Sequence, residues 1–136
     1  MALSDATEET VLNHILGTTE LAFNTNIYLA LGTDTTPSKS TFTEVQTPGT
    51  GGYSRQAVTF AGASGGVATN SSGTHTFGPC ALTSWATIKS FALWTDETST
   101  VASKRMLQGP LSDQTKVVGI GDSVTVAAAA ISVTAT

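Results

Sequence analysis

The sequence predicts a mainly β protein, an antiparallel β-sandwich of jelly-roll type with one short α-helix near the N-terminus. From about residue 26 onward, short alternating or apolar stretches recur, and turns rich in Gly, Pro, Ser and Asp separate them. Several short strands at such spacing are typical of a sandwich. The 136 residues suit one modest hydrophobic core, so we expect a single domain over residues 1–136.

The helix is predicted over residues 5–16, within "SDATEETVLNHILG". Asp5 and Glu8 have the spacing of a capping box, and Ser4 is an alternative N-cap. Gly17 suits the left-handed position that follows a helix. The apolar side chains form one stripe: Val11, Leu12, Ile15 and Leu16. Because a helix this short is marginal alone, we expect the stripe to close an open side of the sandwich.

The strand predictions begin with "NIYLALGT", in which Ile27, Leu29 and Leu31 share one face. The further candidates are residues 41–45, 53–60, 66–70, 74–77, 87–95, 104–111 and 123–136. The stretch 87–95, "TIKSFALWT", is nearly all apolar after its lysine, which indicates a long strand partly buried on both faces. "DETST" and "VGIGDS" are predicted turns.

The segment "GGYSRQAVTF" alternates strictly after two glycines, so Tyr53 and Arg55 fall on one side of the predicted strand and Gln56 on the other. A guanidinium group binds several carbonyls or a carboxylate at once, and Tyr and Arg are enriched at interface hot spots. We therefore expect Tyr53, Arg55 and Gln56 to lie at a contact between subunits or with a coat protein.

In the C-terminal stretch, the apolar residues change from one side of the predicted strand to the other. Val124 and Val126 lie at even positions, whereas Ile131 and Val133 lie at odd ones. A straight strand cannot bury both pairs on one side, so the alanines at 127–130 are predicted to hold a bulge or a tight bend. Alanine also permits close approach of a neighbouring strand or subunit, which makes Ala128 and Ala129 further interface candidates.

The composition narrows the classes of partner. The net charge is −4, only 12% of residues are charged, and the six Lys and Arg residues form no cluster, so no nucleic-acid partner is expected. No apolar run is long enough for a membrane span, and the acidic start predicts no signal peptide. Cys80 is the single cysteine, which excludes an internal disulfide and indicates synthesis in a reducing cytoplasm.

No catalytic, cofactor or metal site is predicted. His14 and His75 have no second ligand at metal-binding spacing, and Cys80 is expected to be a buried, inert thiol. A pair of carboxylates facing each other across a cleft stays possible. A second class of function is carbohydrate binding, with aromatic rings as stacking platforms: Tyr53, Trp85 and Trp94. A position in the core or at an interface is the favoured interpretation of these three rings. Low charge and many strands favour a structural or binding role over an enzyme.

Most of the chain, in the same order, resembles a family of small tailed-phage virion proteins commonly labelled "phage tail fibre protein". The most specific part is residues 53–60, preceded by "ETVLNHILG" and "NIYLALGT" and followed by "SWATIKSFALWTD" and "VVGIGDSVTVAAAAISVT". "QTPGT" lengthens one loop relative to the family pattern, and "SFALWTD" departs from it. The resemblance implies a virion component and supplies no catalytic residues.

From this resemblance we expect a structural protein that is assembled in the host cytoplasm and becomes part of the virion. The leading interpretation is a homotrimeric capsid decoration (cement) protein that binds the major capsid protein and stabilises the shell through many weak contacts. The alternative is a tail fibre or tail-tip subunit that contacts tail proteins and binds a receptor or carbohydrate. A long fibre shaft needs a sequence repeat, and none is visible.

Overall fold

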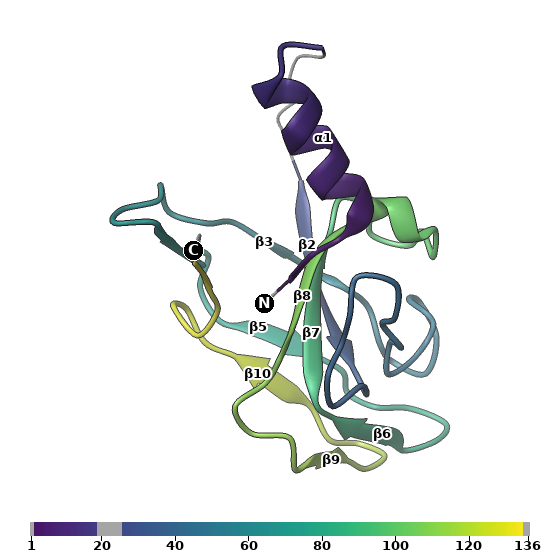
Figure 1. Ribbon diagram of the computed structural model, residues 1–136. Coiled ribbons are helices and arrows are strands. Elements are labelled where there is room, and N and C mark those ends of the chain that lie inside the picture. The colour runs from purple at the N-terminus through teal and green to yellow at the C-terminus, as the bar shows by residue number, and fades with distance from the viewer. Residues whose placement is uncertain (1, 19–25, 135–136) are drawn as a thin grey trace.

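The computed structural model describes residues 2–18 and 26–134. Antiparallel strands dominate this part of the chain, and a short helix stands at its N-terminal end (Figure 1). The strands are β1 (Ala2–Leu3), β2 (Ile27–Gly32), β3 (Gln56–Val58), β4 (Val67–Thr69), β5 (His75–Phe77), β6 (Trp85–Ile88), β7 (Ser90–Trp94), β8 (Arg105–Pro110), β9 (Lys116–Val118), β10 (Val124–Val126) and β11 (Ser132–Thr134). The helices are α1 (Asp5–Ile15) and a 3₁₀ turn, η1 (Ala102–Lys104). The predicted mainly β, antiparallel class with a short N-terminal helix is confirmed.

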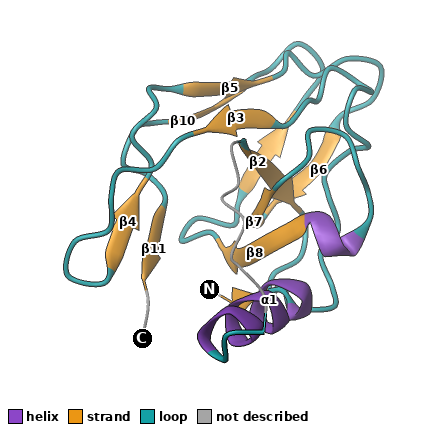
Figure 2. Ribbon diagram, turned by 90° about the horizontal axis from the view of Figure 1, so that it is seen from above, coloured by secondary structure: helices purple, strands orange, loops and turns teal. Residues whose placement is uncertain are grey.

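The strands form one five-stranded sheet, in the order β1-β8-β7-β2-β3, and three two-stranded pairs, β5–β10, β4–β11 and β6–β9. Every pairing is antiparallel. Seen from above, β3, β5 and β10 lie on one side of the molecule and α1 on the other (Figure 2). The jelly-roll connectivity stays a prediction.

A shared apolar cluster joins the large sheet to the small pairs. Its buried members include Leu29, Leu31, Phe91, Leu93 and Leu107 from the sheet and Phe77, Trp85, Ile88, Val118 and Val124 from the pairs. A smaller cluster of Ala30, Ala92 and Trp94 lies on the opposite face of the sheet. Both faces of β2 and β7 are therefore buried, as the apolar run in residues 87–95 predicts.

The predicted long strand over residues 87–95 is in fact two strands that meet at Lys89. β6 pairs with β9, whereas β7 pairs with β2 and β8. The Lys89 amide donates to the Gly32 carbonyl (2.9 Å), and the Lys89 carbonyl accepts from the Leu111 amide (2.8 Å). These bonds hold the chain where it leaves one sheet for another. The strands β1 and β9 were not predicted.

The C-terminal bend is confirmed. β10 pairs with β5 and β11 pairs with β4, so the alanine run carries the chain from one strand pair to the next. Ala129 has a left-handed backbone, with φ +59°. The buried Asn70 organises the bend, because its Nδ2 donates to the Ala127 carbonyl (3.1 Å) and its Oδ1 accepts from the Ile131 amide (2.8 Å).

The predicted strands 41–45 and 53–60 are largely wrong. Residues 41–45 contribute one isolated bridge, between Gly32 and Glu44. Only residues 56–58 of the second segment form a strand, β3. The inward side changes along this segment, because Tyr53 and Arg55 are buried and so is Val58. An uninterrupted strand would place Val58 on the opposite face.

Of the two predicted caps, Ser4 is confirmed and the Asp5–Glu8 capping box is wrong, because Asp5 already lies inside the helix. Ser4 is the N-cap, and its Oγ accepts from the Thr7 amide (3.3 Å). Gly17 has φ +71°, as expected after a helix end. The predicted burial of the apolar stripe is wrong: the helix lies against β8 and η1 without burying any of its residues. The stripe residues are 36–72% exposed.

Candidate functional site

The turn before β3 directs the Tyr53 and Arg55 side chains into the protein. Gly51 and Gly52 have φ of +57° and +78°, a region that glycine adopts readily. A Cβ on Gly52 would lie 1.9 Å from the Pro79 carbonyl oxygen, so no larger residue fits there. The chain thus enters β3 through a tight loop, with Tyr53 1% and Arg55 2% exposed.

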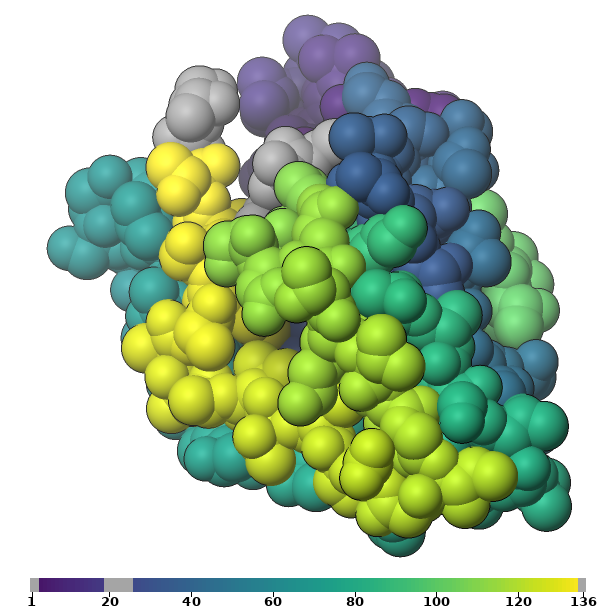
Figure 3. Space-filling view, turned by 90° about the horizontal axis from the view of Figure 1, so that it is seen from below, coloured from purple at the N-terminus to yellow at the C-terminus, as the bar shows by residue number. Residues whose placement is uncertain are grey.

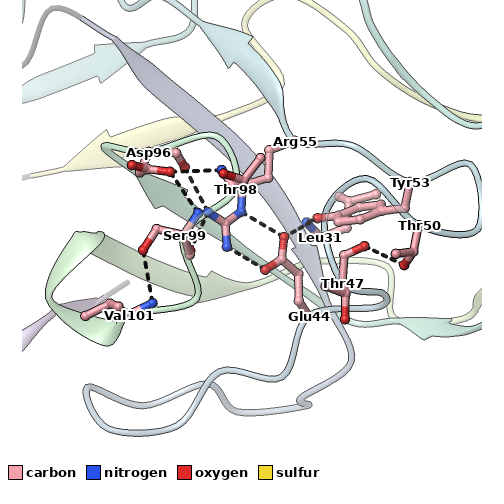
Figure 4. A network of polar contacts seen from close by, with 10 residues as sticks. All are labelled: Leu31, Glu44, Thr47, Thr50, Tyr53, Arg55, Asp96, Thr98, Ser99 and Val101. Atoms are coloured by element: carbon pink, nitrogen blue, oxygen red, sulfur yellow. Dashed lines mark hydrogen bonds and ion pairs between the residues drawn. The ribbon is translucent and has the colours of Figure 1, made fainter.

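Arg55 is the centre of a polar cluster that joins three distant segments (Figure 4). Its Nε and Nη2 donate to the two carboxylate oxygens of Glu44, at 2.9 and 2.8 Å. Its Nη1 donates to the carbonyls of Asp96 (2.8 Å) and Ser99 (2.9 Å). Such a planar fork suits bidentate pairing with a carboxylate. The guanidinium therefore fastens the 42–48 loop and the 95–101 turn to the chain before β3.

The Trp94 ring covers the guanidinium. The Arg55 Cζ lies 3.8 Å from the ring centroid, a close cation–π contact. Phe42 meets Trp94 edge to face, with centroids 6.5 Å apart, and Arg105 lies near both rings. This aromatic cover shields the guanidinium from water, which strengthens its electrostatic attraction to Glu44.

Tyr53 completes the cluster on the other side of Glu44. Its hydroxyl donates to Glu44 Oε1 (2.8 Å) and accepts from the Leu31 amide (3.0 Å). Burial, and then the negative charge of Glu44, raise the pKa of Tyr53 far above its usual value. The phenol stays protonated in the folded protein, so its function is to bridge β2 and Glu44.

Asp96 shapes the turn that offers its carbonyls to Arg55. Its Oδ1 accepts from the amides of Thr98 (2.9 Å) and Ser99 (2.8 Å). These two amide hydrogen bonds, first from Ser99 and then from Thr98, lower the pKa of Asp96. The Ser99 hydroxyl in turn accepts from the Val101 amide (3.2 Å). The turn is thereby held in the conformation that Arg55 requires.

The predicted chemistry of Arg55 is confirmed, since it binds one carboxylate and two carbonyls. Its partners, however, belong to the same chain. The side chains of Tyr53 and Arg55 are covered by their own chain, so the structure assigns them to holding loops together within one subunit. Glu44 was missed as a partner because nothing in a single acidic residue of "TFTEV" indicates a contact with Arg55.

The structure supports the core interpretation of the aromatic rings over the alternative of a platform for sugar stacking. Tyr53, Trp85 and Trp94 are 1%, 2% and 4% exposed, so their faces are unavailable to a ligand. Trp85 donates through Nε1 to the Gly51 carbonyl (3.2 Å) and meets the Tyr53 ring edge to face. All three rings therefore belong to the interior.

A surface cleft of about 500 Å³ adjoins the Arg55 cluster. The 42–48 loop, Trp94 and Thr100 line it. The Glu44 oxygens at this cleft already accept from Arg55 and Tyr53. Apart from Glu44, the polar residues that line the cleft are uncharged: Thr43, Gln46, Thr47 and Thr100.

The other interface candidates lie nearer the surface. Gln56 is half-buried and its amide donates to the Ser54 carbonyl (3.1 Å). Ala128 and Ala129 are exposed in the C-terminal bend. Their role in a contact between subunits stays a prediction.

The predicted buried thiol is confirmed: Cys80 is 2% exposed and its Sγ lies 3.1 Å from the Thr83 carbonyl oxygen. His75 is also buried, with Nε2 2.9 Å from the Ser72 hydroxyl. The described residues contain no group of three or more His, Cys, Asp or Glu side chains placed to hold a metal ion. Within the same ranges, no helix has both the length and the apolar character that crossing a bilayer requires.

Comparison with known proteins links the chain to phages. No curated protein matches the sequence. The family described as Podophage GP4 fiber I protein gp80 matches residues 2–134, which is nearly the whole chain. This confirms the resemblance to phage tail fibre proteins that residues 53–60 and their neighbours indicate. A phage fibre family is a family of structural components of the virion, and this chain belongs to the Podophage GP4 fiber I protein gp80 family.

Proposed function

We propose that this chain is a non-catalytic structural subunit of a tailed-phage fibre, which acts as a homotrimer bound to other tail proteins. The observation that carries the proposal is the match of residues 2–134 to a family described as a fibre protein. The internal role of the Arg55 cluster supports a structural function, because its charged groups are used to fasten loops together.

The Arg55 cluster suits a subunit under mechanical load. Arg55 ties together segments that are 11, 41 and 44 residues away in sequence. Buried, charge-assisted hydrogen bonds are costly to break one at a time. A fibre subunit transmits force between the virion and the cell surface, so loops pinned in this way would keep its contact surfaces in register.

A capsid decoration protein is the second candidate. It is favoured by the absence of a sequence repeat of the kind that builds a long fibre shaft. In that role the same compact subunit would bind the major capsid protein and stabilise the shell through many weak contacts.

Immunogold electron microscopy of intact particles distinguishes the fibre subunit from the capsid decoration protein. Antibodies raised against the purified chain should label the tail fibres if the proposal is correct. Gold distributed over the head would support capsid decoration instead. Antisera against the capsid and the fibres serve as positive controls. If these antisera label the particles and the antibodies against the chain do not, both candidates are wrong.

A further inference from the structure

The segment from β1 to the end of α1 (residues 2–15), termed the N-terminal arm, is weakly attached to the rest of the described chain. α1 projects from the body of the protein (Figure 1), and none of its residues is buried. β1 contributes two residues to the edge of the five-stranded sheet, and the Ser4 amide donates to the Met106 carbonyl of β8 (2.8 Å). Elements that bury little apolar surface open at a low free energy, so the arm is a candidate for local opening.

One ion pair among the described residues links α1 to the loop that follows β2. The Lys39 ammonium contacts the Glu8 carboxylate, and 48% and 41% of the two side chains are exposed. Figure 3 shows the purple helix beside this blue loop at one margin of the molecule. Exposed ion pairs are screened by salt and contribute little to stability. This pair therefore orients the arm without holding it firmly.

The strand beside the arm contains buried polar groups that have no partner among the described residues. Gln108 of β8 is 0% exposed, and both polar atoms of its amide group are of this kind. Gln108 lies opposite Ala92 of β7, so its side chain is on the sheet face of the smaller apolar cluster. Arg105, at the start of β8, is 4% exposed, and its Nε also lacks a partner within the described chain.

Two sets of contacts place these groups next to the arm. The backbone of Gln108 pairs with Ala2 of β1. Arg105 donates through Nη2 to the Lys39 carbonyl (2.6 Å), and the side chain of the same lysine pairs with Glu8 of α1. α1 itself lies against β8. Withdrawal of the arm would therefore open this edge of β8 to water.

A buried amide without a partner lowers stability, because the same group is hydrogen-bonded to water when it is exposed. We propose that the N-terminal arm opens and closes on β8 as one unit while the rest of the fold stays intact, and that the buried Gln108 amide favours the open state. The closed arm covers one edge of the five-stranded sheet, and sheet edges are where further strands pair. The arm would have this property whether or not the chain is a fibre subunit.

Hydrogen exchange of individual amides, followed by NMR on the full chain, tests the proposal. The Ser4 amide and the hydrogen-bonded amides of α1 should exchange with one common opening equilibrium, about 100-fold faster than the amides of β2 and β7. If the Ser4 amide were as protected as β7 while α1 exchanged fast, the helix would fray alone. If α1 were as protected as β7, the arm would not open. Either result would overturn the proposal.

A substitution at Gln108 tests the cause of opening. Gln108→Met removes the amide without a partner, so exchange in the arm should become about fivefold slower than in the parent. Gln114→Met is the matched control, because the Gln114 amide donates to the Thr35 carbonyl (3.1 Å), outside the arm, and it should leave exchange in the arm unchanged. An unchanged or faster exchange in Gln108→Met would refute the role given to this amide.

The ion pair provides an independent measurement. Lys39→Ala should make exchange in the arm only about twofold faster, since the pair is exposed, and added salt should have the same small effect on the parent. Lys116→Ala, in β9 and away from α1 (Figure 1), is the control and should have no effect. An acceleration of about tenfold or more in Lys39→Ala would show that the ion pair holds the arm closed, contrary to the proposal.

Discussion

Arg55 and Glu44 form a bidentate ion pair inside the protein, with 0% and 12% of their side chains exposed. Removing one partner of a buried pair leaves an uncompensated charge, which typically costs about 3–5 kcal/mol. Because Glu44 keeps slight exposure and the Tyr53 hydroxyl bond, we expect Arg55→Ala to lower the free energy of unfolding by about 3 kcal/mol. Urea denaturation measures this effect.

Arg55→Lys should recover only part of the loss, since an ammonium group cannot make the two-pronged contact. Gln56→Ala, the neighbouring surface control, should change the unfolding free energy by less than about 0.5 kcal/mol. If Arg55→Ala instead weakened assembly and left folding unchanged, the internal role of Arg55 would be wrong.

The hydrogen bonds of the Asp96 carboxylate predict how the stability of the protein changes with pH. The folded-state pKa of Asp96 lies below the usual value for an aspartate, because the amides of Ser99 and Thr98 stabilise the carboxylate. A depressed pKa means that the stabilisation is present above the unfolded-state pKa and is lost as the pH falls through the folded-state pKa. Asp96→Asn should therefore be less stable than the parent at pH 6, and the difference should shrink below about pH 3.8.

Melting temperatures between pH 6 and pH 2.5 check this prediction. Glu97→Gln is the control, since Glu97 is an exposed neighbour that accepts neither amide hydrogen bond. A difference between Asp96→Asn and the parent that stays constant over the whole range would refute the assigned role.

Ala129 has a left-handed backbone at the C-terminal bend, with φ +59°. That conformation costs a residue with a Cβ about 1 kcal/mol relative to glycine. Glycine also raises the conformational entropy of the unfolded chain, which offsets part of this gain. Ala129→Gly should therefore stabilise the protein by a net few tenths of a kcal/mol. Ala128→Gly, which relieves no strain, should destabilise it. Equal changes in melting temperature for the two variants would argue against the strained bend.

Gln108 is fully buried in β8, and neither atom of its amide group bonds to a described residue. A buried polar group without a partner is destabilising. Gln108→Met has nearly the same shape without the amide, so we expect a gain in stability of about 1 kcal/mol. Gln114→Met is the control, because the Gln114 amide donates to the Thr35 carbonyl (3.1 Å). A destabilised Gln108→Met would indicate a partner for the amide in the assembled protein.

Local signals in the sequence were sufficient to predict the features whose structure is decided by residues close together in the chain. The Ser4 cap, Gly17, the strand around Leu29 and the bend at Ala127–Ala130 follow from residue type and spacing. Each of these features is decided by side chains within a few positions of one another, which is why the sequence predicts them.

The errors arose where distant contacts decide the structure. The alternation from Tyr53 to Phe60 predicts one strand, but contacts of Arg55 with Glu44 and with the 96–99 turn direct the chain inward before β3 begins. The stripe on α1 predicts a buried face, but a local period carries no information on which distant segment would cover it, and the described part of the chain leaves it exposed. β9 has only three residues, too few for a period to be visible.

The mass of the purified chain in solution tests the central claim, that this protein is an assembling subunit, most directly. Light scattering at several concentrations should give about three times the 13.9 kDa of one chain. A wild-type chain that stays at 13.9 kDa at every concentration, alone and with fibre-less particles, would contradict the account.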